Sequence, residues 1–123
     1  VVFCGTFTAG GLDVEVDDGK LKILREGATA KFLRQVEHIT FSGKYAWKKG
    51  QRVLFVTERA VFSLGETGLV LEEIAPGIDL EKDVLSLMES RPNIAATLRV
   101  MDRRIFMPDT MNLAKAGFEG VAK

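Results

Sequence analysis

Hydrophobic and polar positions alternate most clearly in LDVEVDDGKLKIL, residues 12–24. A two-residue turn at Asp18-Gly19 would place apolar side chains on one face of a hairpin and opposite charges on the other. The pairs in this register are Val16 with Leu21, Val14 with Ile23, Asp17 with Lys20 and Glu15 with Lys22. Because a shift by one residue would bury the charges, the pattern predicts a β-hairpin with this pairing.

A second alternating region, residues 51–74, predicts a meander of three strands. The connections would be a tight turn at Glu58-Arg59 and a loop from Gly65 to Gly68. They would pair Phe55 with Phe62, Val53 with Leu64, Leu64 with Leu69, and Phe62 with Leu71. Apolar residues also occupy the reverse face, so we expect the middle of this sheet to be covered on both sides.

Three further strands are predicted from shorter patterns. The apolar run VVFCGTFTA, residues 1–9, predicts a buried strand before a sharp turn at Gly10-Gly11. Residues 36–41 alternate and predict another strand, and residues 97–102 predict the last one.

Short helices complete the prediction. One would begin at Ser42 as N-cap, and an amphipathic one at Asp79 as N-cap. The tail, residues 108–123, has weak helical character and is expected to be loosely ordered. Together these elements predict a single α/β domain over residues 1–123 that is rich in β-structure and has few helices.

The composition narrows the class of protein. Of 123 residues, 46% are hydrophobic and 28% charged, which is typical of a globular domain with a buried core. Seventeen basic and seventeen acidic residues balance, so nothing favours a nucleic acid or an anionic membrane as partner. Cys4 is the single cysteine, and no apolar run approaches the roughly 20 residues that cross a bilayer. We expect a soluble, cytoplasmic domain.

The loop GTFTAGG raises the question of a phosphate site. Gly5 and Gly10 have the separation found in a P-loop, but that motif continues with Lys and then Ser or Thr. Gly11 and Leu12 stand there instead, which excludes this ATP-binding motif. The glycines then form either a structural turn or a loop that lets the backbone approach a ligand.

The sequence gives little support for a nucleophilic cysteine, a metal site or an acid/base pair. A reactive cysteine needs a base, and no pattern brings Cys4 together with His38, the only histidine. Cys4 is therefore predicted to be a buried, apolar side chain. A zinc site would need further ligands at spacings that the chain lacks. Glu72 and Glu73 are neighbours on a strand and face opposite sides, so they form no acid/base pair. No catalytic residue and no metal ligand is predicted.

Five segments occur in an order that is typical of a known family. They are VVFCGTFTAGGL, KFLRQVEHITFSG, VTERAVFSL, GLVLEEIAPGIDLEKDVL and LRVMD, and they span residues 1 to about 107. In this order they resemble the C-terminal end of family I coenzyme A transferases, above all the single-chain acetate/propionate (acyl-CoA:acetate/3-ketoacid) branch. The resemblance implies the C-terminal portion of the second of two tandem α/β domains, with the missing N-terminal part of the same chain as partner in a homo-oligomer.

The resemblance also implies a reaction. Such enzymes move CoA between a short-chain acyl-CoA and a carboxylate acceptor, such as acetate, propionate or acetoacetate, through a glutamyl-CoA thioester. CoA is then a substrate, and no cofactor is expected. The family's nucleophilic glutamate lies upstream of the segment that residues 1–12 resemble, so the chain is expected to be inactive alone. Glu66, although followed by Thr67-Gly68, lies in a predicted hairpin loop and is not this nucleophile.

Ligands bind at strand ends in open α/β sheets, where the first loop is predicted to lie. With the family resemblance, this predicts Thr6, Thr8, Gly10 and Gly11 near the CoA or acyl pocket of the intact enzyme; alternatively, they only support the family's glycine-rich loop, which is missing from these residues. A rival interpretation is a binding or assembly module without enzymatic activity, which would expose no large apolar patch. The transferase interpretation predicts such a patch. A small Cys/His hydrolase is the least favoured alternative.

Overall fold

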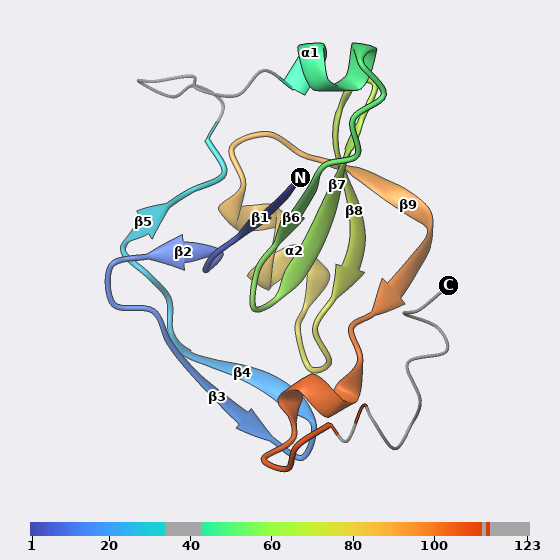
Figure 1. The fold of residues 1–123 in the computed structure, drawn as a ribbon. Helices are drawn as coiled ribbons and strands as arrows, with labels where there is room; N and C mark the ends of the chain where they lie inside the picture. Colours follow the sequence, from blue (N-terminus) through green and yellow to red (C-terminus); the bar gives the residue numbers. More distant parts are fainter. Residues whose placement is uncertain (34–42, 112, 114–123) are drawn as a thin grey trace.

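A computed structural model describes residues 1–33, 43–111 and 113 (Figure 1). Its main sheet has five strands in the order β1-β6-β7-β8-β9. Their bounds are β1 (Val2–Cys4), β6 (Leu54–Val56), β7 (Ala60–Gly65), β8 (Gly68–Ile74) and β9 (Asn93–Val100). The two outer pairs, β1 with β6 and β8 with β9, are parallel, and the inner pairs are antiparallel.

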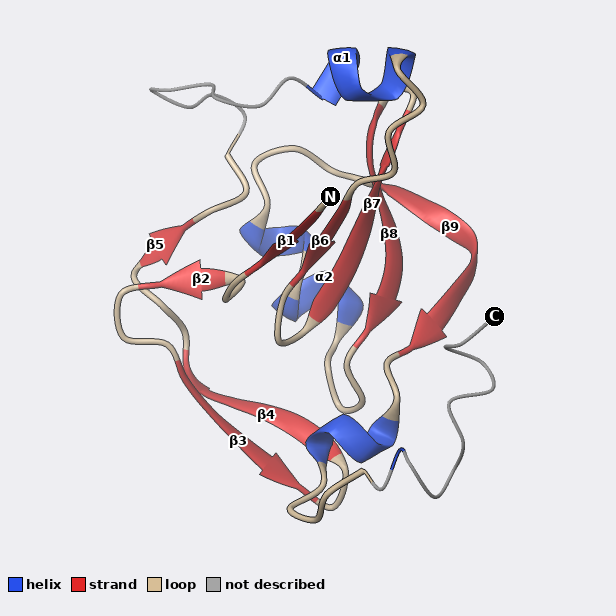
Figure 2. Cartoon of the chain, in the orientation of Figure 1, coloured by secondary structure: helices blue, strands red, loops and turns tan. Residues whose placement is uncertain are grey.

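In the described part of the chain, two small sheets and four short helices surround the main sheet (Figure 2). The small sheets pair β2 (Thr8–Ala9) with β5 (Thr29–Ala30), and β3 (Asp13–Asp17) with β4 (Lys20–Arg25). The helices are α1 (Gly43–Lys48), α2 (Leu80–Asp83) and the 3-10 turns η1 (Leu85–Leu87) and η2 (Arg103–Phe106). The predicted fold class, α/β with mostly β-structure, is confirmed.

The hairpin predicted from the alternating pattern is present in the predicted register. Val14 faces Ile23 and Val16 faces Leu21, and the charged pairs follow. Its turn needs two consecutive positive φ angles, 51° at Asp18 and 73° at Gly19, which match the twist of a tight hairpin. Arg103 of η2 donates to the backbone carbonyl and the carboxylate of Asp18, both at 3.0 Å. This contact attaches the tip of the hairpin to η2 (Figure 1).

The meander is also confirmed. Phe62 of β7 faces Phe55 of β6 and Leu71 of β8, and Leu64 faces Leu69. Phe62 and Leu71 are completely buried and belong to the main core, whose other buried members are Phe7, Ala60, Val84 and Leu85. On the reverse face Val61 is buried with a second cluster of Leu21, Ala75, Met101 and Phe106. The central strand is thus covered on both sides, as predicted.

The prediction of one buried strand over residues 1–9 was wrong. The chain forms two separate strands, β1 and β2, and all three residues of β1 are exposed. Within the described part of the chain, β1 is an edge strand that pairs only with β6. Cys4 is consequently exposed rather than buried. An apolar run predicts a strand, but it does not reveal whether neighbours cover that strand.

The helices are confirmed in part. Asp79 caps α2 by accepting a hydrogen bond from the Lys82 amide at 2.8 Å. However, regular α-helix ends at Asp83, because Val84 leaves helical geometry before η1 begins. The helix expected near Ser42 is present as α1, although Ser42 itself lies outside the described residues. So do the strand expected at residues 36–41 and nearly all of the tail after residue 111.

Candidate functional site

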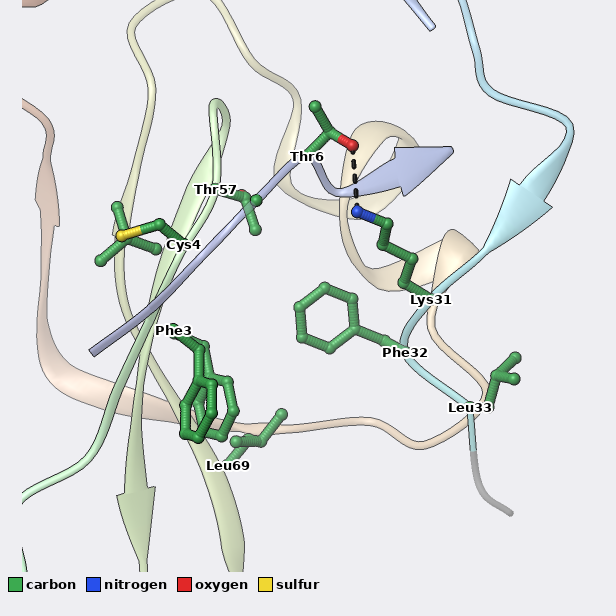
Figure 3. A pocket seen from close by; sticks show the side chains of 11 residues that line it. Phe3, Cys4, Thr6, Lys31, Phe32, Leu33, Thr57 and Leu69 are labelled. Atoms are coloured by element: carbon green, nitrogen blue, oxygen red, sulfur yellow. Dashed lines mark hydrogen bonds between the residues drawn. The ribbon is translucent and has the colours of Figure 1, made fainter. Parts of the chain in front are cut away.

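A cavity of about 340 Å³ lies where the parallel strands β1 and β6 end (Figure 3). Its apolar wall includes Phe3 and Phe55, which face each other across the two strands. Their rings stack with centroids 5.2 Å apart and planes 13° from parallel. Leu69 and the ring of Phe32 extend this wall. The cavity thus occupies the carboxyl ends of parallel strands, the usual place of ligand sites in α/β sheets.

The polar side of the cavity consists mainly of Lys31 and Thr6. The Lys31 ammonium donates a hydrogen bond to Thr6 Oγ1 at 3.1 Å, as Figure 3 shows. The Thr6 hydroxyl in turn donates to the backbone carbonyl of Thr8 at 2.7 Å. Its proton is therefore committed to the loop, and its oxygen accepts from the ammonium. Thr6 fixes the position of the Lys31 head group at the cavity.

Thr8, although predicted near a ligand, is 2% exposed and does not line the cavity. Its hydroxyl donates to Glu26 Oε1 at 2.6 Å and accepts from the Gly27 amide at 3.0 Å. Both bonds connect β2 to the segment that precedes β5. In the described structure, Thr8 stabilises the loop that carries Thr6.

Gly10 and Gly11 form the turn after β2. Their φ angles are +80° and +91°, a region in which glycine is strongly preferred. The Gly10 carbonyl accepts from the Ala28 amide at 3.0 Å, and the Gly11 carbonyl accepts from Arg25 Nε at 2.8 Å. Of the four predicted residues, only Thr6 lines the cavity. Proximity of all four to CoA stays a prediction.

A buried arginine organises the loop, and the sequence patterns did not reveal it. Arg59, at the turn between β6 and β7, has a completely buried side chain. Its two terminal nitrogens bind the two carboxylate oxygens of Glu26 at 2.8 and 2.7 Å, and its Nε binds Glu58 at 2.7 Å. A fourth bond, at 3.1 Å, reaches the Asp83 carbonyl at the end of α2. The guanidinium therefore joins three separate segments of the chain.

The two carboxylates transmit this arrangement to residues 7 and 8. Glu58 accepts a hydrogen bond from the Phe7 amide at 2.8 Å, while Glu26 accepts from the Thr8 hydroxyl. The Phe7 ring also lies 4.9 Å from the Arg59 guanidinium carbon, a cation–π distance. Both residues that follow Thr6 are thereby held in place. The buried Arg59 guanidinium, through its two carboxylate partners, thus holds the loop at the cavity in one arrangement.

Electrostatics keep Glu26 ionised. Its hydrogen bonds with Arg59 lower the pKa of the carboxyl, and the bonds from Thr8 and Gly27 act in the same direction against the opposing effect of burial. An ionised carboxylate can only accept hydrogen bonds, which suits the donors around it. Sequence reasoning placed Glu58 and Arg59 correctly in a turn, but Glu26 lies 33 positions away from Arg59. No local pattern connects them.

Other acidic and thiol groups form no second site in the described residues. Glu72 accepts from the Ser63 hydroxyl at 2.6 Å on the sheet, and Glu66 lies between β7 and β8, in the predicted hairpin loop. His38 lies outside the described residues, so its distance from Cys4 is not defined. Within the described ranges, no three His, Cys, Asp or Glu residues are close enough to hold a metal ion. No helix in these ranges is long and apolar enough to span a membrane.

Proteins with similar sequences are CoA-transferases, whereas no protein-family model matches the chain. Acetate CoA-transferase YdiF of Escherichia coli (strain K12) is 52% identical over 111 residues, covering 90% of this chain and 21% of YdiF. Caffeate CoA-transferase of Acetobacterium woodii is 52% identical over 106 residues, covering 86% and 20%. The chain is thus homologous to a segment of these enzymes and spans about a fifth of their length.

Solved structures agree with this homology. The acyl-CoA transferase YdiF from E. coli O157:H7, determined as a thioester complex with CoA, matches with a TM-score of 0.88 at 52% identity. The match covers 91% of this chain and 22% of the YdiF chain. The apoenzyme of the same protein gives the same values. The mixed sheet with few short helices is therefore the fold of the corresponding CoA-transferase segment.

Proposed function

We propose that these residues are the C-terminal portion of an acyl-CoA:carboxylate CoA-transferase. The observation that carries the proposal is the 52% identity over 90% of the chain with acetate CoA-transferase YdiF. The match to a YdiF thioester complex with CoA supports CoA as the group that the intact enzyme binds. The two relatives are named for different carboxylates, acetate and caffeate. We propose that the acceptor of the intact enzyme is a short-chain carboxylate.

The proposed reaction runs through a glutamate outside this chain. Its carboxylate attacks the acyl-CoA carbonyl and expels the CoA thiolate, which leaves a mixed anhydride. The thiolate then attacks the glutamyl carbonyl, releases the original carboxylate and forms a glutamyl-CoA thioester. An acceptor carboxylate attacks that thioester, and the same steps in reverse order release the new acyl-CoA. On this account the chain contributes a wall of the site and has no turnover alone.

Exposed apolar side chains favour this proposal over a self-contained binding module. Val1 and Val2 are 53% and 58% exposed, beside and on the edge strand β1. In the described part of the chain no strand pairs with the outer edge of β1, and neighbouring apolar groups on such an edge are typical of a surface that another part of a protein covers. We propose that further residues of a homo-oligomeric, cytoplasmic enzyme cover it.

A chimeric enzyme tests the proposal. The homologous segment of E. coli YdiF is replaced by this chain, and transfer of CoA from acetyl-CoA to propionate is measured. YdiF itself and YdiF lacking the segment serve as controls. We expect turnover by the chimera and none by the 123-residue chain. A folded, inactive chimera, or turnover by the chain alone, would contradict the proposal.

A further inference from the structure

The cavity beside β1 and β6 combines an aromatic wall with one cationic group, and this combination selects a class of ligand. We propose that it binds an organic carboxylate with an apolar body, with the carboxylate on the Lys31 ammonium and the body against Phe32 and the Phe3–Phe55 pair (Figure 3). The inference rests on the proposed function, because such a carboxylate would be the acceptor or the released product. It adds the residues that hold this substrate and a preference for apolar chains.

The charge of Lys31 supports an anionic ligand. Among the described residues, no carboxylate forms an ion pair with this ammonium, whose hydrogen bond goes to Thr6 Oγ1. An ammonium has three donors, so two remain for a carboxylate at the mouth of the cavity. Thr6 itself donates to the Thr8 carbonyl and acts by orienting Lys31. Lys31 is therefore the anion-binding group.

The walls support an apolar body. A volume of about 340 Å³ lies at the lower end of the range for small-molecule sites. Phe32, stacked at 4.8 Å on the buried Phe7, adds a third ring to the apolar wall that Phe3 and Phe55 form. Burying a longer apolar chain against these rings adds favourable free energy for each CH₂ group. The cavity should consequently prefer hexanoate to acetate.

The loop at the cavity is prepared for binding. Phe7 and Thr8 follow Thr6 directly, and both are held through the carboxylates that Arg59 binds. A ligand would therefore meet a site whose loop is already ordered, which lowers the entropy lost on binding. This second role of the Arg59 network agrees with a ligand site at Thr6 and Lys31.

Binding to the 123-residue chain tests the inference without any need for turnover. Hexanoate, acetate and the neutral analogue hexanamide are titrated while amide chemical shifts are recorded. We expect hexanoate to shift the signals of residues 3–6 and 31–33 and to bind more tightly than the other two. Lys31→Met should weaken hexanoate binding about tenfold, the effect of losing a charged hydrogen bond, and leave hexanamide unchanged. Lys48→Met, an exposed lysine on α1, is the matched control.

The inference would be overturned by any one of these results: no hexanoate binding at these residues, equal affinity for hexanamide, or unchanged affinity in Lys31→Met. Equal affinity for acetate and hexanoate would remove the apolar preference and overturn it as well. Circular dichroism spectra confirm that the variants are folded. If the YdiF chimera is active and any of these results is obtained, only the carboxylate site is refuted and the proposed function stands. If the chimera is folded but inactive, the proposed function is refuted.

Discussion

Replacing Arg59 by methionine is the most informative perturbation of the fold. The substitution keeps an unbranched side chain but removes a guanidinium that is 0% exposed and makes four hydrogen bonds. Three of the four go to carboxylates, those of Glu26 and Glu58. Removing one partner from a buried ionic network costs about 3–5 kcal/mol, because the remaining charges are left unpaired.

The exposure of the two carboxylates decides where in this range the effect falls. Glu26 and Glu58 side chains are 31% and 17% exposed, so water can reach part of each carboxylate after the substitution. We therefore expect the lower end, a loss of about 3 kcal/mol in the free energy of unfolding. Against the usual total of about 5–15 kcal/mol, this would be a major destabilisation.

Urea unfolding followed by circular dichroism measures this effect. Arg104→Met is the matched control, because Arg104 pairs with Asp102 at 2.6 Å but is exposed; little change is expected there. Arg59→Lys should lie between wild type and Arg59→Met, since one ammonium cannot reproduce the two-pronged contact with Glu26. A loss below about 1 kcal/mol in Arg59→Met would refute the claim that this network holds the loop.

Three further substitutions test the same structure by urea unfolding. The guanidinium bonds hold the pKa of Glu26 below its ordinary value of 4.5, so their stabilisation is complete above that pH and is lost as the pH falls below it. Between about pH 6 and about pH 3, Glu26→Gln should therefore lose less stability than wild type; parallel curves would contradict this assignment. Gly27→Ala places a Cβ against a backbone carbonyl and should lower the free energy of unfolding by about 1–3 kcal/mol. Gly5→Ala is the control and should cost less, because only a lysine head group lies near its Cβ. Equal losses in the two variants would disprove the close approach at Gly27. Leu21→Ala truncates a side chain that is 3% exposed and should lower the free energy of unfolding by about 2–5 kcal/mol. Leu24→Ala is the control and should cost little, because Leu24 is 58% exposed. Similar losses in the two variants would contradict the burial of Leu21 beneath the hairpin.

The local parts of the fold could be predicted from sequence because their information is local. Alternation with period two and an Asp18-Gly19 turn define the register of the first hairpin, and a one-residue slip would bury charge. The same reasoning identified the meander around Phe62. Asp79 was identifiable as an N-cap because its side chain serves an amide only three positions away.

The remaining features depend on tertiary contacts. The exposure of β1 could not be read from VFC, since an edge strand and a central strand share that composition. From the sequence alone, Arg59 looks like a solvent-exposed turn residue. Its partner Glu26, which directly follows β4, lies next to it only in the folded chain. A loop with Thr6 was predicted, but Lys31 and the aromatic wall come from segments that only folding brings together.

The central claim is that this chain completes a CoA-transferase whose nucleophile lies elsewhere. Its most direct test is the intact mass of the YdiF chimera after incubation with acetyl-CoA and no acceptor, followed by peptide mapping. The account predicts one CoA per subunit, joined as a thioester to a glutamate in the YdiF-derived part and released when propionate is added. Absence of the adduct in a folded chimera, while YdiF forms it in parallel, would contradict the account, and so would an adduct on a residue of this chain.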